Sequence, residues 1–343
     1  MRGIHGGDIY RNKVSMDFSV NINPLGMPEG VNRGLLEAIE KCREYPDMEA
    51  FELKQAVSSL LHIPTDYLAF GNGASELFMA IVHAVRPEKI LIPIPSFYGY
   101  EYVSKAVAAE ITFFPLDEKK EFLPGEDLLD AITDDMDLVF LANPNNPTGK
   151  MIEKEYLLRF LTICKEKNII VVLDECFIEF CGDEYSMISE IEAYDNLLLV
   201  RAFTKLYAIP GVRLGYLVCS NKALLDKIQR QLPEWNLSTF AQRAGVACVN
   251  QTEYVKRTVA LVKKERDFLY NGLKKLGFSV FDSDANFVLV STEFPLYERL
   301  LQRGILVRNC ENYKGLTKGY FRIAVKQREE NEKLLKVIGE CFE

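Results

Sequence analysis

The chain has 343 residues, of which 48% are hydrophobic and 26% charged, and its formal net charge is −8. This length exceeds what a single hydrophobic core usually supports, so we expect an ordinary globular protein of two domains. The negative charge argues against a general affinity for nucleic acid or for acidic membrane surfaces.

Cysteine and histidine usage bounds the chemistry further. The eight cysteines contain no Cys-x-x-Cys pair, and only three histidines are present. We therefore expect free thiols in a reducing, cytoplasmic compartment and no catalytic metal. No apolar stretch approaches the ~20 residues of a membrane span, and no signal-peptide core is visible at the N-terminus.

Residues 1–40 are rich in Gly, Asn and Pro, and we expect them to form an irregular arm that contributes to the small domain and the active site. Residues 41–235 alternate helical and strand-like patterns, which predicts a large domain with a mainly parallel sheet covered on both faces. Helices are expected at 49–61, 76–85 and 153–167. The expected strands are at 90–95, 111–116, 138–143, 169–174, 197–202 and 214–219.

Residues 236–343 have a different pattern and predict a smaller α+β domain. A long helical stretch ends at Leu276, because Gly277 is a typical C-terminal cap residue. Three strands are expected at 286–291, 305–308 and 320–325, with helices at 297–303 and 329–341.

Lys205 and Asp174 are the most informative residues. Lys205 follows the apolar run 197–200, and Asp174 ends the apolar run 169–173. Ligands of a parallel sheet bind at the carboxyl ends of its strands. A lysine in apolar surroundings has the lowered pKa that Schiff-base formation requires, and a carboxylate can pair with the nitrogen of a pyridine ring. Alone, each residue is more often a surface lysine or a loop carboxylate; together they predict a site for pyridoxal 5'-phosphate.

A phosphate site is predicted at Gly71-Asn-Gly-Ala-Ser-Glu76, which follows a short apolar run and begins a helix. The backbone N–H groups of Gly73, Ala74 and Ser75 would form an anion-binding turn. Thr204 and Arg213 could add charge-assisted hydrogen bonds to the same phosphate.

The segment Asn143-Pro-Asn-Asn-Pro-Thr-Gly149 ends another strand. Its composition is that of an ordinary turn, but its pattern also places Asn146 to donate to the cofactor's ring oxygen. Phe97 is either a core residue or stacks on the pyridine ring.

Arg308 and Arg322 lie within apolar strand-like segments. Burying an unpaired arginine is costly, so each is expected either to bind a substrate carboxylate or to pair with an acidic residue of the protein.

Together these motifs resemble the fold-type-I pyridoxal-phosphate enzymes, the class I/II aminotransferase superfamily, over nearly the whole chain. The resemblance depends on the 143–149 segment, on Asp174, and on Thr204-Lys205 followed by Arg213-Leu-Gly-Tyr216. It implies that Lys205 carries the cofactor and that Asp174 binds the pyridinium nitrogen. The implied fold is a large, mainly parallel α/β domain with a smaller α+β C-terminal domain.

The same resemblance implies a homodimer with shared active sites. In the superfamily, a Tyr-Pro-Asp segment reaches the cofactor phosphate of the partner subunit, and here that segment is Tyr45-Pro46-Asp47.

Within the superfamily, the sequence is similar to threonine-phosphate decarboxylases of the cobalamin pathway and to their relatives, the histidinol-phosphate aminotransferases. The likeness is carried by segments that include His5-Gly-Gly7, 18–26, 204–211 and 319–325. The His-Gly-Gly arm is typical of the decarboxylases. By this resemblance His5 and Asn23 bind the substrate phosphate, and Arg322 binds an anionic end of the substrate.

Three functions are compared. The favoured one is decarboxylation of L-threonine O-3-phosphate, and the alternative is an aminotransferase acting on histidinol phosphate or a related amino acid. A non-catalytic regulator with this fold is disfavoured because Lys205, Asp174, Asn146 and Arg213 are all present. The choice between the two reactions depends on which bond at the substrate Cα is held perpendicular to the ring.

Overall fold

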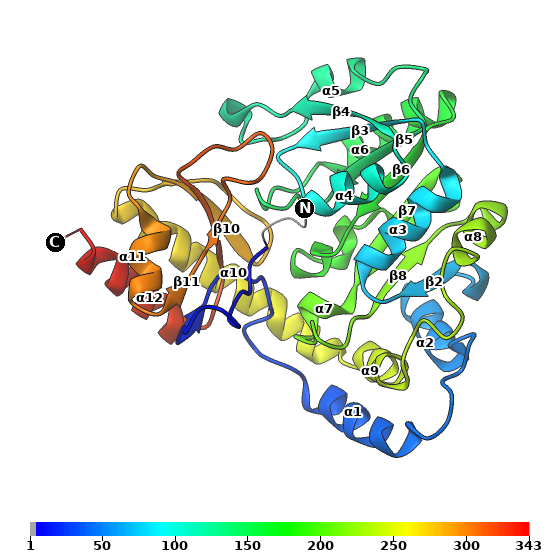
Figure 1. Cartoon of the computed structure of the whole chain (residues 1–343), viewed down its shortest axis with the longest axis horizontal. Helices are drawn as coiled ribbons and strands as arrows, with labels where there is room; N and C mark the ends of the chain where they lie inside the picture. Colours follow the sequence, from blue (N-terminus) through cyan, green and yellow to red (C-terminus); the bar gives the residue numbers. More distant parts are fainter. Residues whose placement is uncertain (1–4, 343) are drawn as a thin grey trace.

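The computed structural model describes residues 5–342, and its largest feature is a seven-stranded sheet (Figure 1). The strands lie in the order β2-β8-β7-β6-β5-β3-β4. Their bounds are Leu68–Gly71 (β2), Lys89–Ile94 (β3), Glu110–Pro115 (β4), Leu138–Ala142 (β5), Ile170–Asp174 (β6), Leu197–Ala202 (β7) and Gly215–Val218 (β8).

The strands β3 to β7 run parallel to one another, and only β8 runs against its neighbours. The predicted mainly parallel sheet is therefore confirmed. The register pairs Ala142 with Asp174, and Asp174 with Val200. The ends of β5, β6 and β7 thus meet at one edge of the sheet, where the chain continues into the segments that carry Asn146, Asp174 and Lys205.

Both faces of this sheet are covered. In β7, Leu197 and Leu199 belong to one buried cluster, whereas Leu198 and Val200 belong to a second cluster on the opposite face. Burial on both faces explains why the strands read as continuous apolar runs. The surrounding helices are α2 (Phe51–Leu61), α3 (Ala74–Val85), α4 (Tyr98–Ala106), α5 (Glu126–Asp130), α6 (Lys154–Glu166), α7 (Phe203–Leu206) and α8 (Lys222–Gln229).

The C-terminal unit contains a four-stranded antiparallel sheet in the order β12-β13-β10-β9. The strand predicted at 305–308 divides at Val307 into two strands that pair with different partners. One of them, β11, pairs with β1 of the N-terminal segment. The bounds here are Met16–Asp17 (β1), Ser279–Val280 (β9), Phe287–Ser291 (β10), Ile305–Leu306 (β11), Arg308–Asn309 (β12), Tyr320–Ala324 (β13), Leu296–Gln302 (α11) and Arg328–Glu340 (α12).

Short 3-10 helices complete the chain at Thr65–Tyr67, Glu118–Lys120, Ile178–Phe180, Asp183–Tyr185 and Met187–Glu190. Within residues 5–342, no helix has the length and apolar character that crossing a membrane requires.

Residues 1–40 were expected to form an irregular arm, and this expectation is wrong for the residues from Glu29 onward. Residues Glu29–Lys41 form α1, which buries Val31 and Ala38. Two glycines within the segment lower its intrinsic helix propensity and conceal the amphipathic pattern. One of them, Gly34, lies so close to α9 that a Cβ there would approach the Ala247 side chain to 3.2 Å. Packing therefore stabilises a helix that propensity alone disfavours.

The long helix expected beyond residue 235 is two helices, α9 (Thr239–Val249) and α10 (Thr252–Lys275). Gly277 has φ +86°, which agrees with its predicted role as the stop. Ala244 in α9 and Val262 in α10 belong to the core of the large unit, whereas Leu269 belongs to that of the C-terminal unit. We therefore propose that the domain boundary lies within α10 and not at residue 235. Figure 1 shows α10 passing between the two units.

Candidate active site

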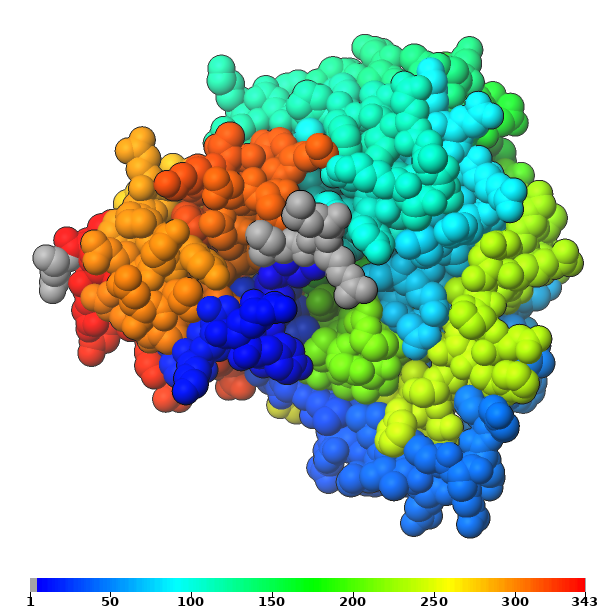
Figure 2. Space-filling view, viewed as in Figure 1, coloured from blue at the N-terminus to red at the C-terminus, as the bar shows by residue number. Residues whose placement is uncertain are grey.

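A cavity of about 780 Å³ lies where the large sheet, the C-terminal unit and the N-terminal segment meet. In Figure 2 the dark blue N-terminal segment lies between the orange C-terminal unit and the green segment that follows β7. Twelve of the fourteen residues predicted for the site line this cavity: His5, Gly73, Ala74, Ser75, Phe97, Asn146, Asp174, Thr204, Lys205, Arg213, Arg308 and Arg322. Asn23 and Tyr45 do not line it.

Lys205 lies in α7, the single turn that follows β7, and its side chain faces the cavity. Its neighbours Phe203 and Leu206 are buried. Burial lowers the pKa of Lys205 to about 8, and the positive charge of Arg322 adds to the effect. A lysine in this state is partly neutral near physiological pH, as a nucleophile must be.

Asp174 is 9% exposed at the end of β6. Its Oδ2 accepts a hydrogen bond from the Tyr100 hydroxyl at 2.6 Å, and its Oδ1 accepts one from the Cys176 backbone N–H at 3.0 Å. Burial raises the pKa of Asp174, and these hydrogen bonds oppose that rise. A carboxylate has about four acceptor positions, so capacity remains for a cationic N–H in the cavity.

The turn before α3 has the form of an anion site. Gly73 has φ +74°, and a Cβ there would lie 2.5 Å from Nη2 of Arg213. No side chain caps the start of α3, which leaves backbone N–H groups of the first turn directed at the cavity. Glu76 accepts hydrogen bonds from the Asn72 backbone N–H at 2.7 Å and from the Asn236 side chain at 2.9 Å. These hydrogen bonds stabilise the conformation of the turn.

The side chain of Asn146 is oriented by Arg322. The Oδ1 atom of Asn146 accepts a hydrogen bond from Nη1 of Arg322. Because arginine only donates, this contact fixes the oxygen of the amide and leaves its NH2 group to donate elsewhere. That orientation is the one that a hydrogen bond to a ring oxygen requires.

Arg322 and Arg308 lie on the C-terminal side of the cavity. Arg322 donates to the Ser19 carbonyl at 3.0 Å, and its Nε is buried with no hydrogen-bond partner among residues 5–342. Within that range no carboxylate forms an ion pair with Arg322. For Arg322 this excludes the alternative of a structural ion pair with an acidic residue. Arg308 donates to Asn312 Oδ1 at 2.7 Å.

His5 also lines the cavity, with its ring centroid 6.1 Å from that of Phe97. Partial burial lowers the pKa of His5, and the positive charges of Arg308 and Arg322 lower it further. The two guanidinium groups therefore create a region of positive potential that suits an anionic ligand, and the lowered pKa of His5 favours its neutral form, which can still donate a hydrogen bond.

Two of the predicted site residues, Asn23 and Tyr45, do not line the cavity. The sequence predicts that Asn23 binds substrate phosphate, but its Nδ2 donates to the Leu206 carbonyl and to Thr258 Oγ1, both at 2.7 Å. Its Oδ1 accepts from the Leu25 N–H, so Asn23 braces the segment after Lys205 instead of facing the cavity. Tyr45 is 83% exposed and packs on Trp235, with ring centroids 5.1 Å apart. Its role toward a partner subunit stays a prediction.

Asn21, Tyr100 and Tyr313 are among the residues at or near the cavity that the sequence did not predict. Asn21 is 2% exposed and lines the cavity, and its Oδ1 has no hydrogen-bond partner among the described residues. Asn21 lies two residues before the predicted Asn23, and only the backbone path decides which of the two side chains lines the cavity. Tyr100 and Tyr313 were missed because their partners are remote in sequence.

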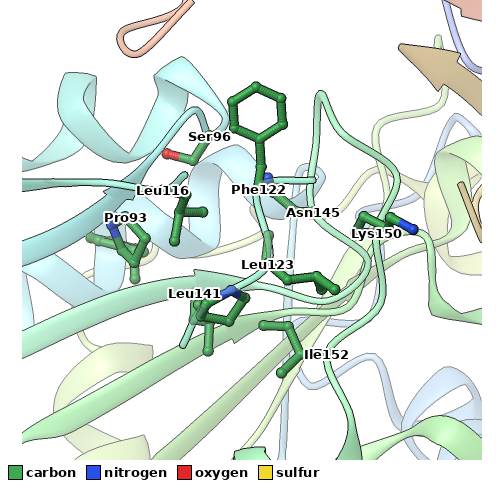
Figure 3. Close-up of a pocket in the computed structure, with 12 residues that line it drawn as sticks. Pro93, Ser96, Leu116, Phe122, Leu123, Leu141, Asn145, Lys150 and Ile152 are labelled. Atoms are coloured by element: carbon green, nitrogen blue, oxygen red, sulfur yellow. The ribbon is translucent and has the colours of Figure 1, made fainter. Parts of the chain in front are cut away.

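A second cavity, behind the 143–149 turn, has a volume of only about 20 Å³. Figure 3 shows the aliphatic and aromatic side chains that surround it, with the polar residues Ser96, Asn145 and Lys150 beside them. This volume accommodates about one water molecule, so the cavity is too small for a substrate.

Comparisons with known proteins agree with this geometry. A model of the aminotransferase class I and II family matches residues 13–338. The threonine-phosphate decarboxylase of Salmonella typhimurium is 35% identical over 324 residues, which cover 93% of this chain and 89% of that protein.

Two solved structures are also similar. The histidinol-phosphate aminotransferase from Clostridium acetobutylicum has a TM-score of 0.90 at 37% identity, and the L-threonine-O-3-phosphate decarboxylase from Porphyromonas gingivalis has 0.86 at 26%. Each comparison covers 95% of this chain and 98% of the other. Proteins similar to this chain in sequence and fold therefore include enzymes with two different activities.

Proposed function

We propose that this chain, which belongs to the pyridoxal-phosphate-dependent class I and II aminotransferase family, decarboxylates L-threonine O-3-phosphate. The resemblance and the fold class predicted from the sequence motifs are confirmed. The observation that carries the proposed substrate is that His5, Arg308 and Arg322 line the same cavity as Lys205.

The residues of the cavity fit the cofactor. The open turn at 73–75, with Thr204 and Arg213 beside it, suits a phosphate dianion. We propose that Phe97 stacks on the ring, that Asn146 donates to the ring oxygen and that Lys205 forms the covalent attachment. When bound, the pyridine ring withdraws electrons from the substrate Cα.

Asp174 would keep that ring protonated. At an effective dielectric constant near 20, a charge pair ~4 Å apart gains roughly 4 kcal/mol. This energy corresponds to about three pKa units of the ring nitrogen. The buried position of Asp174 protects the interaction from solvent screening.

The Nζ atom of Lys205 would transfer the proton at Cα. Its pKa of about 8 lies close to neutral pH, where a group can both accept and return a proton efficiently. In the proposed reaction the carboxylate leaves as CO2, and a proton replaces it at Cα.

Arg308, Arg322 and His5 would select the reaction by holding the carboxylate and the phosphate of the substrate. Both groups are anionic, and arginine binds each of them in a bidentate manner. Where these residues place the carboxylate determines whether its bond to Cα, or the bond from Cα to hydrogen, lies perpendicular to the ring.

The second candidate is a histidinol-phosphate aminotransferase. It is supported by the Clostridium acetobutylicum structure, which has the higher identity of the two structures compared. The Salmonella relative and the His-Gly-Gly arm support the decarboxylase and a place in cobalamin biosynthesis.

We also propose that the protein acts as a homodimer in the cytoplasm. Tyr45, Met48 and Phe51 are each more than half exposed beside the half-exposed Trp235. Such an apolar surface is typical of an interface. All eight cysteines are free thiols, as is usual in a reducing compartment.

One assay separates the two reactions. The purified enzyme is incubated with threonine phosphate and cofactor but without a keto acid, and CO2 and aminopropanol phosphate are measured. Product formation supports the decarboxylase, whereas turnover that requires 2-oxoglutarate contradicts it. Lys205→Ala serves as the inactive control.

A further inference from the structure

One side chain that the proposed function does not use touches three of the residues that it does use. The hydroxyl of Tyr313 lies 3.4 Å from Nη1 of Arg322 and 3.4 Å from Oδ1 of Asn146. The ring of Tyr313 lies under the guanidinium group of Arg308, with 5.1 Å between the ring centroid and Cζ. Tyr313 is 6% exposed and lines the cavity.

The backbone around Tyr313 is held in place from the large unit. Lys314 lies 3.8 Å from the carboxylate of Glu101 and 4.6 Å from the ring centroid of Phe113. Gly315 packs so closely that a Cβ there would lie 3.2 Å from the Pro95 nitrogen. The loop between β12 and β13 is therefore docked on the large unit, and Tyr313 is a fixed point between the two units.

The two parts of this side chain act on different partners. The hydroxyl accepts from Arg322, and its own proton is directed at Asn146 Oδ1, which Arg322 also contacts. The aromatic face attracts the positive charge of Arg308, an interaction worth more where solvent is excluded. One rigid side chain thus sets the positions of two arginines that come from different strands.

We propose that Tyr313 is a specificity-determining positioning residue that holds Arg308 and Arg322 at the separation needed to bind both anionic groups of the substrate. This inference depends on the proposed function, because it assigns the two arginines to a carboxylate and a phosphate. The ordinary alternative is that Tyr313 only fills space beside Cys310 and Leu316 in its buried cluster.

Tyr313→Phe distinguishes these possibilities, because it keeps the ring and its packing and removes only the hydroxyl. The matched control is Tyr320→Phe, the same chemical change on β13 outside the cavity lining. The probe is 3-phosphooxypropanoate, which carries a carboxylate and a phosphate but no amino group and so cannot react. Its dissociation constant from the holoenzyme is measured by calorimetry, with KM and kcat for threonine phosphate measured in parallel.

The change removes a hydrogen bond to the charged Arg322, so we expect Tyr313→Phe to weaken probe binding and to raise KM roughly tenfold. The melting temperature should stay close to that of Tyr320→Phe, and Tyr313→Leu, which also removes the ring, should weaken binding further. Unchanged probe affinity in Tyr313→Phe would overturn the proposal. A reduced kcat with unchanged KM and unchanged probe affinity would also overturn it.

Failure of the proposed function gives a different result. If the wild-type holoenzyme binds no phosphorylated compound, the substrate assignment is wrong, and glutarate, a dicarboxylate, replaces the probe. Weaker glutarate binding in Tyr313→Phe than in the wild type would then support the positioning role, and equal binding would refute it.

Discussion

The hydroxyl of Tyr100 donates a 2.6 Å hydrogen bond to Oδ2 of Asp174, which joins helix α4 to the end of strand β6 at the base of the cavity. Tyr100 is fully buried and stacks on Phe140, with ring centroids 4.9 Å apart and an interplanar angle of 8°. Its hydroxyl therefore has a fixed position, and it supports the ionised form of a carboxylate whose pKa burial raises.

Tyr100→Phe should weaken cofactor binding. The lost hydrogen bond to a charged group contributes about 1.5–3 kcal/mol, so Asp174 should protonate at a higher pH in the variant. Because only the carboxylate pairs with the pyridinium, the cofactor affinity should fall at a higher pH than in the wild type. Cofactor dissociation constants measured from about pH 5 to about pH 8 test this shift.

Tyr156→Phe is the control for this change, because Tyr156 donates a 2.8 Å hydrogen bond to the neutral Gly125 carbonyl, far from the cavity lining. Identical pH profiles in the Tyr100 and Tyr156 variants would contradict the role given to Tyr100.

Gly73→Ala should disrupt the predicted phosphate site. The change introduces a Cβ at φ +74° and 2.5 Å from Nη2 of Arg213. The backbone there, with φ +74° and ψ 172°, lies in a region that is essentially restricted to glycine and costs another residue about 1–3 kcal/mol, and the displaced arginine should weaken cofactor binding in addition. Gly277→Ala is a matched control, since Gly277 has φ +86° and a Cβ there would meet no atom within 4 Å. We expect both variants to lose stability, measured by urea unfolding, but a lower cofactor affinity only in Gly73→Ala.

The stability of the cofactor-free protein should depend on Lys205 in a defined pH range. Burial lowers the pKa of Lys205 from 10.5 to about 8. Between these values the unfolded chain binds more protons than the folded one, so the free energy of unfolding should rise with pH. Lys205→Met should remove this rise and stabilise the protein below about pH 8 by on the order of 3 kcal/mol. Lys336→Met, at an exposed position, should change neither quantity.

Arg201 and Glu175 form a buried ion pair beneath the site, with Nε of Arg201 3.1 Å from Oε2 of Glu175. Glu175 also accepts hydrogen bonds from Ser186 and from the Met187 backbone. Arg201→Ala should cost roughly 3–5 kcal/mol of unfolding free energy, because it leaves a buried carboxylate without its partner. Lys89→Ala breaks the solvent-exposed pair with Asp135 and should cost much less, because water screens that pair. Chemical unfolding of both variants tests the difference, and equal losses would contradict it.

The large sheet was predictable because its strands are apolar on both faces and therefore stand out in the sequence. The strand at 197–202 has the predicted bounds, and the other predicted strands of the large unit differ by one residue at one or both ends. Helix α1 was not predictable in this way. Its stability comes from contact with α9, more than two hundred residues away, which local propensity does not report.

The sequence by itself determined the positions of Lys205, Asp174 and the 71–76 turn. Each follows an apolar strand within a few residues, and parallel strands place their carboxyl ends at one edge of the sheet. Only the tertiary structure decided that Asn21 and not Asn23 faces the cavity, and that Tyr100 and Tyr313 contact residues of the site. These contacts join segments that are far apart in the chain, so they depend on how the units pack and leave no local pattern in the sequence.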